Sequence, residues 1–309
     1  MGGGGGGPFR NTEPETLKKQ VREAEEKTTD AAFEVAVNES LLQLLAEFND
    51  RDIQLVNIRL GAIKELINDE IDDAIDSLYG GSVAKHTYVD GLSDIDSLLI
   101  VNGTKYEKYQ PKEILDAFAK IINARLGNDA VINVGRIAIT VSYKDGMKIQ
   151  LLPAIRTSEG LKVPAWKREG WSNIDPDKFR AGLSKRNAEC HEKIVPLIKL
   201  VKAINSNFPE DVQLSGYHIE SLAIAAFRGY DGDCTLSRML PHYFDKAKNL
   251  VMKPIEDKSG QSLHVDEYLG PENSEQRQQA SHILGRVEKR TRNATAARSQ
   301  DQWISLFGQ

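Results

Sequence analysis

Two aspartates and a glycine–serine pair are the residues of this sequence whose types and spacing could do chemistry together. Asp94 and Asp96 stand at alternate positions before the apolar run 98–101, and Asp94 follows the pair Gly81 and Ser82 by about a dozen residues. Residues i and i+2 of a strand project from one face, so the two carboxylates would repel each other without a cation between them. We expect Mg²⁺ there, with Mn²⁺ as an alternative, because hard divalent ions take carboxylate and phosphate oxygens as ligands.

The glycine–serine pair suits a triphosphate. Gly81 has no side chain, so a phosphate can approach its backbone, and Ser82 offers both an N–H and an O–H donor. Either motif alone is usually a solvated strand end or a loop, but the two together before a buried strand are more specific. This stretch therefore predicts a triphosphate site beside a metal site.

The composition is that of a globular protein. The chain has 309 residues, 40% of them apolar and 28% charged, which suits one large or two closely packed domains. The formal net charge of −5 does not indicate a broad nucleic-acid-binding surface, and no apolar run is long enough to span a membrane. The N-terminal glycine run lacks the apolar region of a signal peptide, and the two cysteines lack metal-site spacing. These features favour a cytoplasmic location.

Hydrophobic periodicity predicts an α/β first part and a helical second part. We expect a disordered tail over residues 1–13, a catalytic lobe over 14–165 and a helical lobe over 166–309. Apolar residues spaced by three or four positions over 51–78 predict a long spine helix of the catalytic lobe, ending at the glycines 80 and 81.

The remaining elements follow from the same patterns and from turn residues. Asp145 and Gly146 lie between two β-rich runs and predict a hairpin. We expect strands at 96–102, 131–143 and 147–155, helices at 14–28, 31–49, 111–125, 183–204 and 214–229, one or two helices over 274–307, and looser connectors at 156–176 and 230–272.

Several motifs together resemble one known family, the bacterial relatives of cyclic GMP-AMP synthase within the DNA polymerase β-like superfamily. These are the oligonucleotide cyclases (CD-NTases) of the anti-phage signalling systems called CBASS. The similar segments are the glycine–serine and aspartate motifs, a strand ending in Leu152-Pro153-Ala154, the stretch 214–220 and the C-terminal stretch 297–308.

The resemblance implies a fold and an activity. The fold would be α+β and bilobed, with a polymerase β-like nucleotidyltransferase core and a C-terminal helical lobe. The activity would be Mg²⁺-dependent synthesis of a cyclic di- or trinucleotide second messenger from NTPs, with no nucleic acid and no membrane required. The partners would be an effector that senses the product and, in some systems, ubiquitin-transfer-like or other regulatory proteins that act on the cyclase.

The resemblance also implies roles for individual residues. Asp94 and Asp96 would be catalytic and hold the metal, and position 150 would be the third catalytic position. Lys202 matches a phosphate-binding lysine, Tyr217 matches an aromatic residue that stacks on a base, and Ser215 lies near a phosphate-contacting serine. The usual second serine is Gly216 here. The nucleotide-binding residues implied are Gly81, Ser82, Lys202, Ser215 and Tyr217.

Position 150 departs from the family pattern, because a glutamine replaces the usual third aspartate. An amide oxygen can ligate a metal, but it has no charge and is a poor general base. Gln150 is either a tolerated variant, or another acid such as Asp145 or Glu220 supplies the charge, or the protein is a weak or inactive nucleotide-binding member. We adopt the first hypothesis.

One alternative activity remains open. A template-independent RNA nucleotidyltransferase, of the CCA-adding or poly(A) kind, would share the glycine–serine and aspartate motifs but would need a stronger RNA-binding surface.

Two histidines lie in or near these motifs. His218, within the stretch 214–220, is expected to be a packed, hydrogen-bonded histidine rather than a metal ligand. His86 is expected in the loop near the nucleotide.

Overall fold

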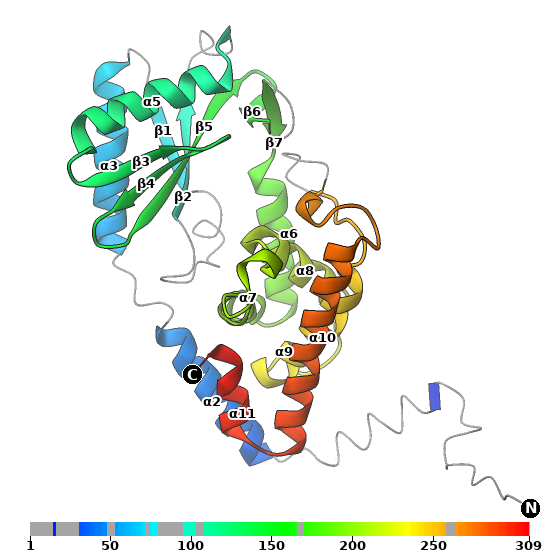
Figure 1. Cartoon of the computed structure of the whole chain (residues 1–309). Helices are drawn as coiled ribbons and strands as arrows, with labels where there is room; N and C mark the ends of the chain where they lie inside the picture. The colour runs from blue at the N-terminus through cyan, green and yellow to red at the C-terminus, as the bar shows by residue number, and fades with distance from the viewer. Residues whose placement is uncertain are drawn as a thin grey trace, which may run out of the picture.

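The structure is a computed structural model, and it describes residues 15–16, 31–47, 53–71, 75–79, 95–102, 108–165, 170–257 and 264–308. A sheet with two long helices forms one part of the molecule, and a group of helices forms the other (Figure 1). The expected helix within residues 14–28 and the expected tail 1–13 lie almost entirely outside the described residues. The α+β fold class is confirmed.

The sheet is mixed. Its order is β1-β2-β5-β4-β3, and β6 extends β5 and pairs with β7. Strands β2 and β5 run parallel, and the other pairs are antiparallel. The strands are β1 (Ile75–Tyr79), β2 (Ile95–Val101), β3 (Ala130–Val134), β4 (Ile139–Tyr143), β5 (Lys148–Thr157), β6 (Gly160–Pro164) and β7 (Trp171–Ile174).

Strand β2 is buried on both faces, as its continuous apolar run predicts. Leu99 and Val101 pack into a core with helices α3 (Ile53–Glu70) and α5 (Pro111–Leu126), whereas Leu98 and Ile100 pack on the other face with Ala154 and Val163. Alternating residues of one strand therefore serve two different cores. The helix expected at 111–125 is confirmed.

The hairpin expected at Asp145 and Gly146 is confirmed. The Tyr143 N–H donates to the Met147 carbonyl over 2.9 Å, and Gly146 adopts a φ of +92°, a conformation that favours glycine. The carboxylate of Asp145 accepts from both Nη atoms of Arg59, at 2.7 and 3.1 Å, which ties the turn to α3. The Arg59 guanidinium also lies 3.8 Å from the centre of the Tyr143 ring.

A single core joins the helices of the second part. Tyr243, Phe244 and Trp303 are among its largest buried side chains. Its helices are α2 (Ala31–Glu47), α6 (Pro176–Glu189), α7 (Ile194–Asn205), α8 (Gly216–Ala226), α9 (Leu236–Leu250), α10 (Glu275–Ala296) and α11 (Gln300–Ile304).

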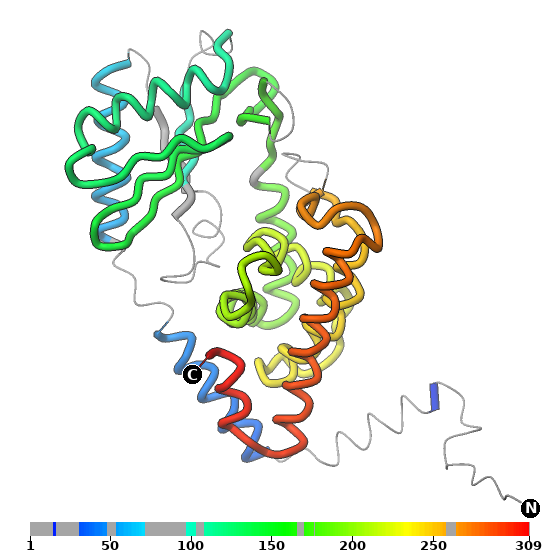
Figure 2. Tube along the Cα trace, viewed as in Figure 1, coloured from blue at the N-terminus to red at the C-terminus, as the bar shows by residue number. Residues whose placement is uncertain are grey.

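Helix α2 belongs to this helical core, although it precedes the sheet in sequence. Val37, Leu41, Leu44 and Leu45 pack into it, and α2 lies beside α11 from the opposite end of the chain (Figure 2). The expected boundary between the two lobes at residue 165 stays a prediction. Helix α2 lies before this boundary in sequence but packs with the helices that follow it.

The expected spine helix 51–78 is wrong beyond residue 70. Helix α3 ends at Glu70, and Ile75–Tyr79 form strand β1, which pairs with β2 along its whole length. The last turn of α3 has no basic residue and is followed by two more aspartates, 72 and 73, which is unfavourable at the negative end of a helix dipole. Helical spacing alone did not distinguish the edge strand from a continued helix.

Four other expectations need correction. The connector 156–176 contains strands β6 and β7, and the connector 230–272 contains the long helix α9, whose internal Pro241 concealed it. The helix expected at 183–204 is two helices, because His191 and Glu192 adopt positive φ values of 51° and 61° between them. The run 131–143 is likewise two antiparallel strands.

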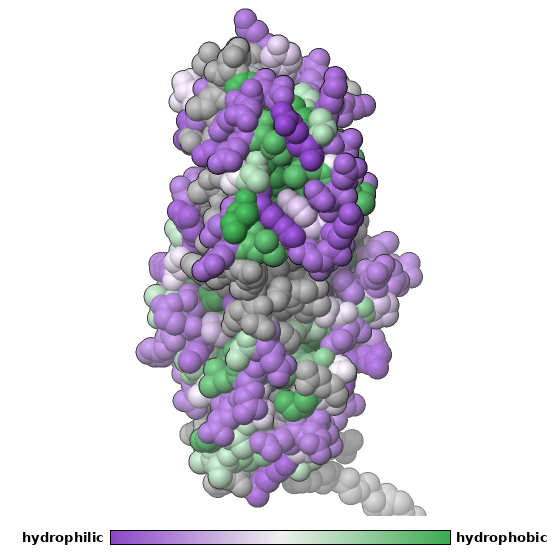
Figure 3. Space-filling view, turned by 90° about the vertical axis from the view of Figure 1, so that its left-hand side faces the viewer, coloured by the Kyte–Doolittle hydropathy of each residue, from purple (hydrophilic) through white to green (hydrophobic). Residues whose placement is uncertain are grey.

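The surface of the described part is mostly polar. Apolar side chains gather among polar ones over the sheet part on the face shown in Figure 3. Exposed large apolar side chains among the described residues include Ile58, Val131 and Val134. No helix within the described ranges is long and apolar enough to cross a membrane.

Candidate active site

The register of the sheet brings position 96 beside position 150. In the parallel pair β2–β5 the Cα of Asp96 is opposite that of Gln150, and in the pair β4–β5 Gln150 is opposite Thr140. The structure describes the backbone of Asp96, whereas Gly81, Ser82, His86 and Asp94 lie outside the described residues. The sheet thus aligns Asp96 with Gln150, the residue at the expected third catalytic position.

Gln150 lies on the face of β5 turned away from α3 and α5. Its neighbours Ile149 and Leu151 are fully buried in the core beneath those helices, so side-chain alternation directs the half-buried Gln150 to the opposite face. Gln150 shares this face of β5 with Leu152 and Ala154. The side chain on this face opposite position 96 is therefore a neutral amide, which can ligate a metal or form hydrogen bonds but cannot act as a base.

The two acids considered as substitutes are engaged elsewhere. Asp145 pairs with Arg59 at the hairpin, and this hydrogen-bonded cation lowers the pKa of its carboxyl group. Glu220 is 1% exposed on α8 and pairs with Lys202 on α7. Neither contact brings a carboxylate to Gln150.

Lys202 forms a buried ion pair. Its Nζ lies 2.9 Å from Oε1 of Glu220, and its side chain is only 7% exposed. A Cβ added at Gly216 would lie 3.4 Å from this Nζ, so the glycine gives the ammonium room beside the start of α8. The structure therefore places the Lys202 ammonium beside Gly216, which follows the predicted residue Ser215 in the chain.

Ser215 caps helix α8. Its Oγ accepts from the His218 N–H over 3.2 Å, and its own N–H donates to the Tyr268 hydroxyl over 3.0 Å. A serine at this position satisfies an otherwise unpaired N–H of the first turn. Its hydroxyl thus already has a structural role in the described state.

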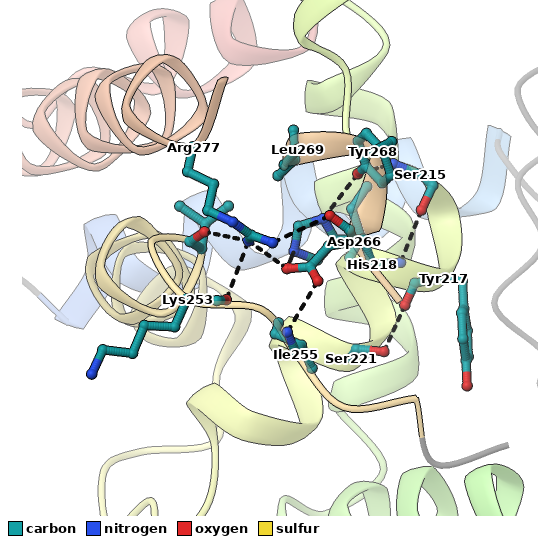
Figure 4. Close-up of polar contacts among 12 residues, drawn as sticks. Ser215, Tyr217, His218, Ser221, Lys253, Ile255, Asp266, Tyr268, Leu269 and Arg277 are labelled. Carbon is teal, nitrogen blue, oxygen red and sulfur yellow. Dashed lines mark hydrogen bonds and ion pairs between the residues drawn. The ribbon is translucent and has the colours of Figure 1, made fainter. Parts of the chain in front are cut away.

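Tyr217 lies on the first turn of α8. Its hydroxyl donates to Oδ1 of Asp257 over 2.7 Å, and its ring packs against that of Phe179 with the centres 4.5 Å apart. Its side chain points away from the polar cluster formed by its neighbour His218 (Figure 4). The ring is half-buried, which leaves part of it accessible.

His218 is packed and hydrogen-bonded, as expected. It is fully buried, and its Nδ1 lies 2.9 Å from the Tyr268 hydroxyl. Burial lowers its pKa to about 4, so it is neutral near pH 7. Its Nε2 lies 3.5 Å from Oδ2 of Asp266, which in turn pairs with Arg277 (Figure 4).

Sequence reasoning missed Asp257, Asp266, Tyr268 and Arg277. The first three come from the connector between α9 and α10 and contact residues at the start of α8 that are far away in sequence, and Arg277 on α10 pairs with Asp266. No spacing rule links them, so only the buried contact reveals them.

A hard divalent cation fits the chemistry of the predicted ligands. Two carboxylates and an amide oxygen, from Asp94, Asp96 and Gln150, are oxygen donors of the kind that Mg²⁺ takes alongside substrate phosphates. Within the described residues, no group of three or more His, Cys, Asp or Glu side chains could hold a metal by itself. The ligand set thus depends on Asp94, which is outside those residues.

The mixed sheet, the alignment of Asp96 with Gln150 on parallel strands and the helical part with its buried lysine fit the expected nucleotidyltransferase architecture. The matching family is the Second Messenger Oligonucleotide or Dinucleotide Synthetase domain (SMODS), over residues 36–187. The chain carries this domain, and it is an enzyme that synthesises an oligonucleotide or dinucleotide second messenger. The resemblance to the bacterial relatives of cyclic GMP-AMP synthase is confirmed.

Solved structures share the fold. CdnC of E. coli MS115-1, solved with ATP, has 14% identity and a TM-score of 0.66, over 91% of this chain and 98% of that chain. CdnG of Bradyrhizobium diazoefficiens, solved with GTP, has 14% identity and a TM-score of 0.66, over 88% and 95%. The Vibrio cholerae cyclic AMP-GMP synthase DncV, with nonhydrolysable GTP, has 13% identity and a TM-score of 0.61, over 96% and 90%.

The same CdnC is also solved in a complex with HORMA-deltaN, and this structure covers 87% of the present chain with a TM-score of 0.63 and 14% identity. No curated protein matches the chain in sequence. At these low identities the structural likeness shows the fold, and the family match supplies the class of reaction.

Proposed function

We propose that the enzyme joins NTPs into a cyclic di- or trinucleotide in a divalent-metal-dependent reaction. The observation that carries this proposal is the alignment of Asp96 with Gln150 on the parallel strands β2 and β5, inside the matched domain. The family match favours a messenger synthetase over the RNA-extending alternative.

Asp94, Asp96 and Gln150 are the residues that would hold the metal. The chemistry that a bound Mg²⁺ supplies is activation of a ribose hydroxyl and neutralisation of the leaving pyrophosphate. Gln150 adds no charge, so the two aspartates and the substrate phosphates provide the negative ligands. This arrangement predicts weaker metal binding than a site with three carboxylates.

The bond changes are those of nucleotidyl transfer. The ribose hydroxyl oxygen of one nucleotide forms a bond to the α-phosphorus of another, the bond from that phosphorus to the bridging oxygen breaks, and pyrophosphate leaves. The hydroxyl proton passes to a carboxylate or to water, because the neutral amide of Gln150 cannot accept it. A further transfer within the linear intermediate closes the ring.

Lys202, Ser215 and Tyr217 would bind nucleotide from the helical part. Glu220 orients the Lys202 side chain, whose ammonium would donate to a phosphate oxygen. The half-buried ring of Tyr217 offers a surface on which a base can stack. Gly81 and Ser82 would bind the triphosphate from the sheet part.

The cellular role that we propose is anti-phage signalling. The product would act on an effector that senses it, and a regulatory protein is the second class of partner. The CdnC complex with HORMA-deltaN supports this second class, since that relative associates with another protein.

Product analysis tests the proposal. The protein is incubated with all four NTPs and Mg²⁺ or Mn²⁺, treated with phosphatase, and the products are identified by mass spectrometry, with Asp96→Asn as the control. Phosphatase-resistant cyclic products lost in the control are expected. Only linear products would exclude cyclisation, tailing of added RNA would favour the RNA-extending alternative, and NTP binding without turnover would indicate an inactive member.

A further inference from the structure

The first turn of α8, which carries Ser215 and Tyr217, is held by a segment far along the chain. We call this segment the α9–α10 connector, comprising the described residues 251–257 and 264–274. The two halves lie antiparallel at the bridge between Glu256 and His264, and the Val265 N–H donates to the Ile255 carbonyl over 2.9 Å.

A buried arginine organises this connector. Arg277 is fully buried and donates from Nη1 to the carbonyls of Val251 and Lys253, at 2.8 and 3.2 Å, and from Nε to those of Gly270 and Pro271, at 3.0 and 3.1 Å. One guanidinium therefore joins both halves of the connector. Its planar set of donors suits several acceptors at fixed angles.

Asp266 is the partner of this arginine inside the connector. Its Oδ2 accepts from Arg277 Nη1 over 2.7 Å, and its Oδ1 accepts from the Ile255 N–H over 3.0 Å. Both side chains are 0% exposed. Buried charges that are paired and hydrogen-bonded in this way hold a single geometry, since any displacement leaves a charge unsatisfied.

Two side chains of the connector then reach the first turn of α8. The Tyr268 hydroxyl contacts the Ser215 N–H at 3.0 Å and His218 Nδ1 at 2.9 Å. Asp257 Oδ1 accepts from the Tyr217 hydroxyl over 2.7 Å. The helix end that carries the nucleotide-binding residues is thus held at two points.

The Tyr268 hydroxyl joins two groups of the first turn of α8. Its oxygen accepts from the Ser215 N–H, and the Asp266 carboxylate facing Nε2 of His218 favours the neutral tautomer with its proton on Nε2, in which the Tyr268 O–H donates to Nδ1. The Tyr268 ring is half exposed while its hydroxyl reaches this buried chain of contacts. Loss of the hydroxyl alone would break two contacts without emptying the core.

We propose that Tyr268 and Asp257 are positioning residues, which hold the first turn of α8 in the geometry that binds nucleotide. This inference rests on the proposed function, because it assigns nucleotide binding to Ser215 and Tyr217. It adds that the α9–α10 connector determines how well the enzyme binds its NTP.

Tyr268→Phe tests the first contact, with Tyr230→Phe as the matched control. Tyr230 lies in the same helical part, near the other end of α8, and its hydroxyl donates to the Asp233 carbonyl over 2.9 Å without contacting the first turn of that helix. For Tyr268→Phe we expect KM for NTP to rise about five- to tenfold with kcat within about twofold, as for a lost hydrogen bond that affects binding. The melting temperature should change little in either variant.

Hydrogen–deuterium exchange of the protein without nucleotide separates this inference from the proposed function. Tyr268→Phe should speed exchange over residues 215–221, and Tyr230→Phe should not. Equal exchange in the two variants, or faster exchange with an unchanged KM, overturns the inference while the enzyme assignment stands. A wild-type protein without turnover of any NTP overturns the proposed function, and with it the nucleotide role of Tyr268.

Asp257→Ala and Tyr217→Phe test the second contact as a pair. Each single change removes one partner of the same hydrogen bond, so we expect each to raise KM several-fold and the double variant to raise it no further. Fully additive effects, with KM multiplied in the double variant, would overturn the assignment of Asp257.

Discussion

Arg277 and Asp266 form an ion pair to which solvent has no access, with Nη1 and Oδ2 2.7 Å apart. The pair joins α10 to the connector that contacts the first turn of α8 (Figure 4). The ion pair has a structural role. It holds the connector that carries Tyr268, and Tyr268 contacts the turn for which we propose nucleotide binding.

Arg277→Lys should be strongly destabilising. A lysine cannot reproduce the guanidinium contacts to Asp266 and to several carbonyls, so buried polar groups lose their partners. We expect the free energy of unfolding to fall by about 3–5 kcal/mol, measured by urea denaturation. Arg180→Lys is the control, because its pair with Asp177 is exposed and should contribute less than about 1 kcal/mol. Similar losses in both variants would contradict the role of burial.

The stability of the protein should fall in acid through His218. Burial lowers its folded pKa to about 4, below the usual 6.5, so between these pH values the unfolded chain binds the proton more readily. The stabilisation is complete above pH 6.5 and is lost as the pH falls towards 4. His218→Asn removes the titrating group and keeps a polar atom near Nδ1. Denaturation midpoints from pH 8 to 4 should fall less steeply in this variant, and parallel curves would contradict the prediction.

Asp96→Asn should abolish nucleotide turnover, whereas Gln150→Ala should reduce it less. The first change removes a proposed metal-binding charge, and the second removes only a neutral ligand. Turnover is measured with radiolabelled NTPs. Wild-type activity in Asp96→Asn would refute the catalytic site.

Gln150→Asp is the complementary change. Its position opposite Asp96 means that a third carboxylate would strengthen divalent-ion binding, so half-maximal activity should need less Mg²⁺ than in the wild type. Thr140→Ser, on the neighbouring strand opposite Gln150, is the control and should leave this requirement nearly unchanged. A higher Mg²⁺ requirement in Gln150→Asp would argue against a metal at this position.

Lys202→Ala should destabilise the fold as well as weaken nucleotide binding. It leaves Glu220 buried at 1% exposure without its cation, which costs about 3–5 kcal/mol. Lys202→Met combined with Glu220→Leu should recover most of this stability but not NTP binding, measured by calorimetry. Lys248→Ala, at more exposed pairs with Asp245 and with Glu288, is the control and should cost about 1 kcal/mol or less, because Glu288 keeps its pair with Arg292. NTP affinity at the wild-type level in the double variant would exclude Lys202 from the site.

Local patterns predicted the elements whose stability is local. Helix α5 has its apolar stripe with Pro111 at the first position, β2 has a continuous apolar run, and the turn at Asp145 and Gly146 has the residues that a hairpin needs. The same patterns failed where pairing decided the outcome. Ile75–Tyr79 fits a helical stripe and becomes a strand only because the edge of β2 accepts it.

The sequence by itself indicated the class of enzyme, because its motifs resemble those of the bacterial relatives of cyclic GMP-AMP synthase and the family match agrees. Only the tertiary structure decided that Gln150 is aligned with Asp96, that Lys202 pairs with Glu220, and that the α9–α10 connector holds the first turn of α8. The reason is that spacing along a chain constrains neighbours within a strand or helix. Contacts between distant segments depend on how the strands and helices pack, and buried charges then require partners that no local pattern names.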